Sequence, residues 1–179
     1  MKFIAATYSI TDERKEKVDF AGPYLLAHQD LLVKKDSDIT EATDLNDKKL
    51  CSVTGSTSAQ NVKKDFAPKA QLKQVGTYSE CVAALQSGAV DALTTDDSIL
   101  AGFAAQEQYA GKFKLAGLKL SNENYGIGVK KGDTETTDKI NAALEKMVGD
   151  KAWDKAVEAN FGPAEYNNEP APKIGNIVK

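Results

Sequence analysis

The stretch Tyr78–Asp97, YSECVAALQSGAVDALTTDD, decides the fold class. Its apolar residues recur at the spacing of one helix face, which predicts a helix over Tyr78–Gln86. The short apolar run Ala89–Thr94 follows and predicts a buried strand. Two carboxylates, Asp96 and Asp97, come directly after that strand. A helix, a buried strand and polar residues at the strand's end are typical of an α/β domain.

The same alternation of helix and strand extends outward from this stretch. Further strands are expected at Lys49–Thr54, Gln71–Val75, Phe113–Leu120 and Tyr125–Lys130, and further helices at Thr57–Phe66, Asp97–Gln108 and, as a pair, within Thr134–Phe161. Two apolar segments, Val18–Tyr24 and Leu31–Val33, precede them. The alternation predicts βαβ units and a parallel sheet between Leu31 and Tyr125.

Length and composition limit the class of protein. The chain has 179 residues, of which 41% are hydrophobic and 27% charged, enough for one globular domain or two small ones. The net charge of −3 disfavours nucleic acid and anionic membranes as partners. The chain contains no run of about 18 apolar residues. Its start is far short of the apolar region of a signal peptide, so nothing in the sequence as written directs export.

The two cysteines, Cys51 and Cys81, are the next features. With one histidine, His28, they lack the spacing of a metal site, so no metal is expected. The alternatives are a disulfide and two buried thiols. We favour the disulfide, because a strand and a helix two elements later can touch in an α/β domain. It would contribute about 3–4 kcal/mol in the chain-entropy account and favours an oxidising compartment.

Three polar features point to a ligand. The turn Gly55–Ser58 follows a strand and opens a helix, so its N–H groups and hydroxyls form a seat for an anion. The alternative is that these residues only cap the helix. Of Asp96 and Asp97, we expect one to cap a helix and the other to be free. Arg14 can hold a carboxylate through two parallel hydrogen bonds, or it is an ordinary surface arginine. Together an anion seat, a guanidinium and a free carboxylate suit a zwitterion, namely an α-amino acid.

Several segments, in order along the chain, resemble one family. They are ATYSITDERKEKVDFAGPY, LLVKKDSDI, DLNDKKLCSVTGSTS, YSECVAALQSGAVDALTTDD, NYGIGVKKGD and NFG. They are similar to the polar amino-acid-binding proteins of ABC importers, which have the periplasmic binding protein type 2 fold. The segments CSVTGST and VDALTTDDSILAGF look like the glutamate-binding branch of Gram-positive actinobacteria. The resemblance implies two α/β lobes joined by a hinge that close on the ligand.

The resemblance also implies how the ligand is held. Arg14 would hold the α-carboxylate with help from Ser9, and Ser56 and Thr57 would complete the anion seat. Asp96 would hold the α-ammonium, with a main-chain carbonyl near Thr7 assisting. Tyr8 and Tyr125 are expected to serve packing or the hinge, and His28 to lie in the crossover. No cofactor is expected, and glutamate is favoured by the branch alone.

In that family a first stretch of lobe 1 precedes the segment that carries Arg14. We therefore expect a chain shortened at its start, with residues 1–25 a remnant of lobe 1, 26–123 a complete lobe 2, and 124–179 the return to lobe 1. A sheet that lacks leading strands exposes an edge, which favours a strand-paired or domain-swapped dimer.

The resemblance implies a transport role without bond chemistry. The parent protein would work outside the cytoplasmic membrane, as a lipoprotein or in the periplasm, and deliver its ligand to an ABC permease and ATPase. Two other classes stay open. One is a dehydratase-like enzyme on the same fold, with Asp97 the nearby acid or base. The other is a sensor module that gates a kinase or channel.

Overall fold

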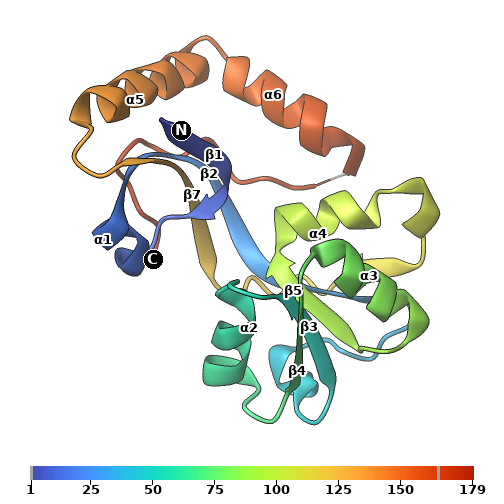
Figure 1. The fold of residues 1–179 in the computed structure, drawn as a ribbon. Coiled ribbons are helices and arrows are strands. Elements are labelled where there is room, and N and C mark those ends of the chain that lie inside the picture. The colour runs from blue at the N-terminus through green and yellow to red at the C-terminus, as the bar shows by residue number, and fades with distance from the viewer. Residues whose placement is uncertain (1, 165) are drawn as a thin grey trace. The chain divides into compact units, whose positions relative to one another are not determined.

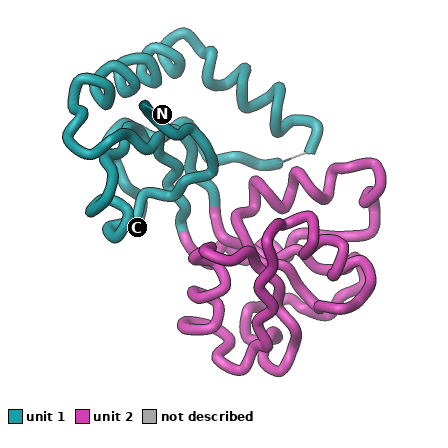
Figure 2. The backbone as a smooth tube through the Cα atoms, viewed as in Figure 1, with its two compact units in different colours: residues 1–27, 122–179 teal, residues 28–121 magenta. Residues whose placement is uncertain are grey.

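The computed structural model describes residues 2–164 and 166–179, which form two compact units (Figures 1 and 2). Unit 1 contains residues 1–27 and 122–179, and unit 2 contains residues 28–121. The expectation for residues 1–25 includes Met1, which lies outside the described residues. The assignment of the three segments to lobes of a binding protein stays a prediction. No helix in the described part of the chain has the length and apolar character needed to cross a membrane.

Unit 2 is a sheet with both faces covered. Its strands are β2 (Val18–Lys34, shared with unit 1), β3 (Lys49–Val53), β4 (Gln71–Val75), β5 (Ala92–Asp96) and β6 (Phe113–Leu115). Its helices are α2 (Ser58–Asn61), which continues as a π-helical turn over Val62–Phe66, α3 (Tyr78–Ser87) and α4 (Asp97–Ala104), with 3-10 turns at Ala42–Leu45 and Glu107–Tyr109. The order of neighbouring strands is β2, β5, β3, β4, and β6 also pairs with β2.

Alternation along β2 builds the two sides of the core. Leu31 and Val33 belong to a buried cluster that includes Val62, from the turn after α2. Leu32 belongs to the other cluster, with residues of α3 and α4. Because successive side chains of a strand point to opposite faces, this run of apolar residues is buried on both faces.

The disulfide expected from the sequence is confirmed. Cys51 of β3 and Cys81 of α3 are bonded, with their Cα atoms 5.6 Å apart, and both side chains are fully buried. The bond lies in the cluster that contains α3 and α4.

The sheet is mixed, so the prediction of a parallel sheet is wrong in part. β3 runs parallel to β4 and to β5, as expected. β2 runs antiparallel to β5 and to β6. The segments Val18–Tyr24 and Leu31–Val33, which the sequence presented separately, are one strand of 17 residues.

Several element boundaries also differ from those expected. The strand predicted over Ala89–Thr94 begins only at Ala92, because the N–H groups of Ala89 and Val90 bond back to the carbonyl of Ala84 at the end of α3. The strand predicted over Phe113–Leu120 ends at Leu115. Gly117 follows there with a φ of +78°, a conformation that glycine adopts without strain.

Unit 1 contains β1 (Phe3–Ser9), α1 (Asp12–Lys17), the first part of β2, β7 (Asn122–Lys130), α5 (Thr134–Gly149) and α6 (Ala152–Phe161), followed by a 3-10 turn at Gly162–Ala164. The two helices expected within Thr134–Phe161 are present (Figure 1). Tyr125 and Trp153 pack in its buried cluster, and the Trp153 indole donates to the Tyr24 carbonyl at 2.7 Å. β1 pairs with β7 and stands at the end of the strand order, with Phe3 and Ile4 about half exposed. Pairing of β1 between two copies stays a prediction.

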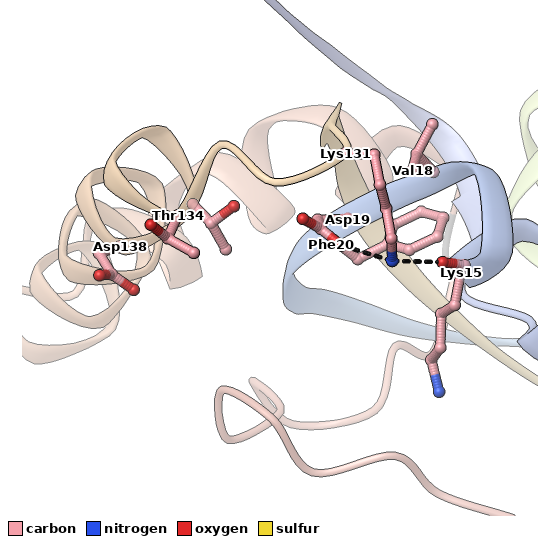
Figure 3. A pocket seen from close by; sticks show the side chains of 8 residues that line it. Lys15, Val18, Asp19, Phe20, Lys131, Thr134 and Asp138 are labelled. Atoms are coloured by element: carbon pink, nitrogen blue, oxygen red, sulfur yellow. Dashed lines mark hydrogen bonds and ion pairs between the residues drawn. The ribbon is translucent and has the colours of Figure 1, made fainter.

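An ion pair joins β2 to the segment between β7 and α5. The Lys131 ammonium lies 2.8 Å from the Asp19 carboxylate and donates to the Lys15 carbonyl at 2.7 Å (Figure 3). The Gly132 N–H donates to the other Asp19 oxygen at 2.7 Å. The hydrogen bond from Lys131 and the one from Gly132 hold the pKa of Asp19 below its usual 3.8.

Asp30 is the buried carboxylate of β2 in unit 2. One of its oxygens accepts the N–H groups of Leu31 at 2.7 Å and Leu118 at 3.0 Å, and the other accepts that of Gly117 at 2.8 Å. Burial raises the pKa of Asp30, and these three hydrogen bonds oppose the rise. The carboxylate thereby fixes the chain after β6 against β2.

Replacing Asp30 should destabilise the fold. Asp30→Ala leaves three N–H groups without their acceptor and is expected to lower the free energy of unfolding by about 2–4 kcal/mol. Asp38→Ala is the control, since that side chain is 86% exposed and 3.6 Å from Lys48, and it should cost less than about 0.5 kcal/mol. Urea unfolding followed by circular dichroism measures both. Equal midpoints for the two variants would contradict this role of Asp30.

The pKa of Asp19 predicts a pH dependence. A carboxyl whose folded pKa is lowered stabilises the fold above its unfolded pKa, near 3.8, and this contribution disappears as the pH falls through the lowered value. The difference in melting temperature between the wild type and Lys131→Met should therefore be largest near pH 6 and shrink on acidification. In an Asp19→Asn background the Lys131→Met substitution should show no such dependence. If the difference in melting temperature between the wild type and Lys131→Met were just as large below pH 3, Lys131 would not be what lowers the pKa of Asp19.

Candidate functional site

Arg14 is held in place in unit 1 by a backbone carbonyl and an aromatic ring. Its Nη1 donates to the Ser9 carbonyl at 2.8 Å, and its guanidinium lies 4.7 Å from the centre of the Tyr8 ring. Thr11 caps α1 by accepting the Arg14 N–H at 3.2 Å. Among the described residues no ion pair to Arg14 forms. A half-buried guanidinium that is oriented but unpaired is suited to an incoming carboxylate.

The other two predicted residues of unit 1 lie on β1. Ser9 is buried, and the structure brings its backbone to Arg14. Thr7 is exposed on the same strand, and no contact of the described residues joins it to Arg14. Tyr8 packs against Phe20, with ring centres 5.0 Å apart, and Tyr125 lies in the core. The expected packing role of these two tyrosines agrees with their positions.

The predicted anion seat of unit 2 follows β3. Gly55 has a φ of +85°, and the Ser56 N–H donates to the Val53 carbonyl at 3.0 Å, so the chain turns sharply into α2. Ser56 Oγ accepts the Ser58 N–H at 3.2 Å. Thr57 stands at the N-cap, but its side chain makes no capping hydrogen bond. The hydroxyls of Ser56 and Thr57 therefore flank the positive end of a helix.

The carboxylates at the end of β5 differ from the expectation. Asp96 is the last residue of β5 and stands at the N-cap of α4, yet its side chain forms no capping hydrogen bond. Asp97 Oδ1 accepts the N–H groups of Ser98 at 2.8 Å and His28 at 3.0 Å. Both aspartates are buried, and neither is without a partner. The expectation that one of the two is free is therefore wrong.

A tyrosine links the turn to the strand end, which the sequence did not reveal. Thr95 Oγ1 donates to Tyr78 Oη at 2.6 Å, and Tyr78 Oη donates to Ser56 Oγ at 3.4 Å. Thr95 is the immediate neighbour of Asp96. The sequence pattern predicts only that a helix begins at Tyr78, because periodicity gives no information on a phenol's hydrogen bonds.

Gln29 of β2 is a second residue that the pattern missed. Its amide nitrogen donates to the Ser58 carbonyl at 2.8 Å and to Thr94 Oγ1 at 3.0 Å, and its amide oxygen accepts from Asn61 at 3.1 Å. The side chain is fully buried. One signal was available, since Gln29 lies in the polar run 28–30 between apolar residues of the same strand. The amide fixes α2 against β5.

The cavity in Figure 3 is separate from the predicted residues. It has a volume of about 430 Å³ and is lined by Lys15, Val18, Asp19, Phe20, Lys131, Thr134, Thr137 and Asp138. None of the predicted ligand-binding residues lines it. Residues 2–164 and 166–179 contain no group of three histidine, cysteine, aspartate or glutamate side chains that could hold a metal ion.

The comparisons with curated proteins point to amino-acid binders. The chain is 52% identical over 166 residues to the glutamate-binding protein GluB of Corynebacterium efficiens, covering 89% of this chain and 55% of that protein. It is 44% identical over 153 residues to the ABC transporter glutamine-binding protein GlnH of Bacillus subtilis, covering 85% of this chain and 55% of GlnH. The chain thus spans about half the length of the curated relatives it matches.

Solved structures show the same fold. An ancestral arginine-binding protein bound to glutamine has a TM-score of 0.82 and 42% identity, covering 90% of this chain and 72% of that one. The GluR0 ligand-binding core from Nostoc punctiforme, in complex with L-glutamate, has a TM-score of 0.80 and 27% identity, covering 90% of this chain and 73% of that one. The family described as bacterial extracellular solute-binding proteins, family 3, matches residues 1–163. The chain therefore belongs to the family 3 bacterial extracellular solute-binding proteins.

Proposed function

We propose that this chain provides ligand-binding residues of an extracytoplasmic protein that captures a polar amino acid, with L-glutamate favoured, for an ABC importer. The observation that carries the proposal is the oriented, unpaired guanidinium of Arg14. An arginine in this state suits the carboxylate that every α-amino acid shares. The name of the Corynebacterium relative, a glutamate-binding protein, supports glutamate as the ligand.

Different residues bind the two charged groups of the amino acid. Arg14, in unit 1, binds the α-carboxylate. In unit 2 the hydroxyls of Ser56 and Thr57 supply further donors for the same group, and Asp96 accepts from the α-ammonium. Ser9 fixes the guanidinium through its carbonyl, and the backbone near Thr7 supplies a further acceptor.

The enzyme reading has weaker support. One structure with 34% identity and a TM-score of 0.79 is an ancestral amino acid-binding protein described as a precursor of cyclohexadienyl dehydratase. The acid or base that this reading needs is Asp97, and one oxygen of its carboxylate already accepts two backbone N–H groups. The hydrogen bonds of Asp97 join β2 to α4, which is a structural role. Transport by a permease and ATPase accounts for the relatives without any bond chemistry.

Calorimetric titration of the chain with L-glutamate, L-glutamine, L-aspartate and L-arginine tests the proposal. Binding of glutamate in preference to the other three supports it, and binding of arginine alone would contradict the specificity. A folded chain that binds none of the four would contradict the proposed function. Light scattering on the same sample gives the mass and tests for a paired dimer.

Arg14→Ala should weaken binding by about 2–5 kcal/mol, because the ligand carboxylate loses a charged partner in a desolvated site. Lys15→Ala is the matched control, since Lys15 is exposed on the same helix and its ammonium lies 3.2 Å from the Asp12 carboxylate. The affinity of this variant for the ligand should not change. Arg14→Lys should restore part of the loss, because lysine keeps the charge but not the fork of donors. Wild-type affinity in Arg14→Ala, measured by calorimetry, would remove Arg14 from the site.

A further inference from the structure

We infer that Tyr78 is a positioning residue for the Ser56 hydroxyl. By donating to Ser56 Oγ, Tyr78 leaves that hydroxyl able only to donate, and the α-carboxylate of the ligand is the acceptor. The inference rests on the proposed function, because it needs an amino acid to be bound. It concerns unit 2 alone, where Thr95, Tyr78 and Ser56 form one chain of hydroxyl groups.

In the structure each hydroxyl of this chain donates to the next one, from Thr95 to Tyr78 and from Tyr78 to Ser56. A hydroxyl has one hydrogen to donate. Thr95 Oγ1 donates its hydrogen to Tyr78 Oη at 2.6 Å, and Tyr78 Oη donates its own hydrogen to Ser56 Oγ at 3.4 Å. Ser56 Oγ also accepts the Ser58 N–H at 3.2 Å, so its two lone pairs are occupied. The hydrogen of Ser56 is then the one that remains for a ligand.

This direction selects the charge of the ligand group. A hydroxyl that can only donate binds a carboxylate and cannot accept from an ammonium. The contact from Tyr78 to Ser56 is long for an O–H···O hydrogen bond, and an anionic acceptor on Ser56 strengthens the whole chain through cooperativity. Asp96, next to Thr95, is the acceptor proposed above for the ammonium, so different residues bind the two charged groups of the ligand.

The fold holds the phenol in place from two sides. Tyr78 is the first residue of α3, and its N-cap, Thr77, accepts the Glu80 N–H at 3.3 Å. One turn later Cys81 is bonded to Cys51 of β3, the strand from which the Ser56 turn leaves. The disulfide at one end and the Tyr78 hydrogen bond at the other therefore join the same two segments.

A double-mutant cycle read by calorimetry tests the inference. The affinities of L-glutamate and L-glutamine are measured for the wild type, Tyr78→Phe, Ser56→Ala and the double variant. Tyr78→Phe removes only the phenol oxygen and should weaken both ligands by the same factor, roughly fivefold to tenfold for one hydrogen bond. Tyr109→Phe is the control, because its ring packs on Phe113 and its affinity should be unchanged.

The cycle separates a positioning role from a structural one. If Tyr78 acts through Ser56, Tyr78→Phe has no further effect in the Ser56→Ala background. Additive losses would show that the Tyr78 hydroxyl acts independently of Ser56 and would overturn the inference, as would an unchanged affinity in Tyr78→Phe. A loss for glutamate alone would assign Ser56 to the side-chain carboxylate and also overturn it. A wild-type chain that binds neither ligand contradicts the proposed function instead.

Discussion

The burial of two polar side chains on one strand is the constraint on which unit 2 depends. Gln29 and Asp30 are adjacent on β2 and almost inaccessible to water. A buried polar group costs free energy unless its hydrogen bonds are satisfied. Gln29 meets this requirement only with α2 and β5 in place, and Asp30 only with the segment after β6 in place. The two side chains thus demand one arrangement of elements that apolar packing alone would not specify.

That arrangement brings the candidate ligand groups together. Gln29 fixes the start of α2 to the end of β5, and the Thr95–Tyr78–Ser56 chain joins the same two places nearer the surface. Both connections are made within unit 2, so the donors of the turn and the carboxylate of Asp96 are placed before any ligand arrives. Such pre-organisation reduces the ordering cost of binding.

Local patterns predicted much of this fold, because they depend on residues close in sequence. The helix that begins at Tyr78 and the strand before Gly55 follow from short-range periodicity. The bond between Cys51 and Cys81, 30 positions apart, was favoured over two buried thiols only because a strand and a helix two elements later can touch in an α/β domain. The antiparallel direction of β2 could not be predicted, since it depends on pairing with residues 59 to 67 positions away. The same holds for Gln29, whose partners at positions 58 and 94 are distant in sequence. Periodicity gives no information on such partners.

A crystal structure of the chain grown with L-glutamate tests the central claim most directly. The account predicts that an α-carboxylate oxygen lies within hydrogen-bond distance of Ser56 Oγ, and that the α-ammonium lies against the Asp96 carboxylate. A glutamate bound with its ammonium toward Ser56, or bound away from both residues, would contradict the account.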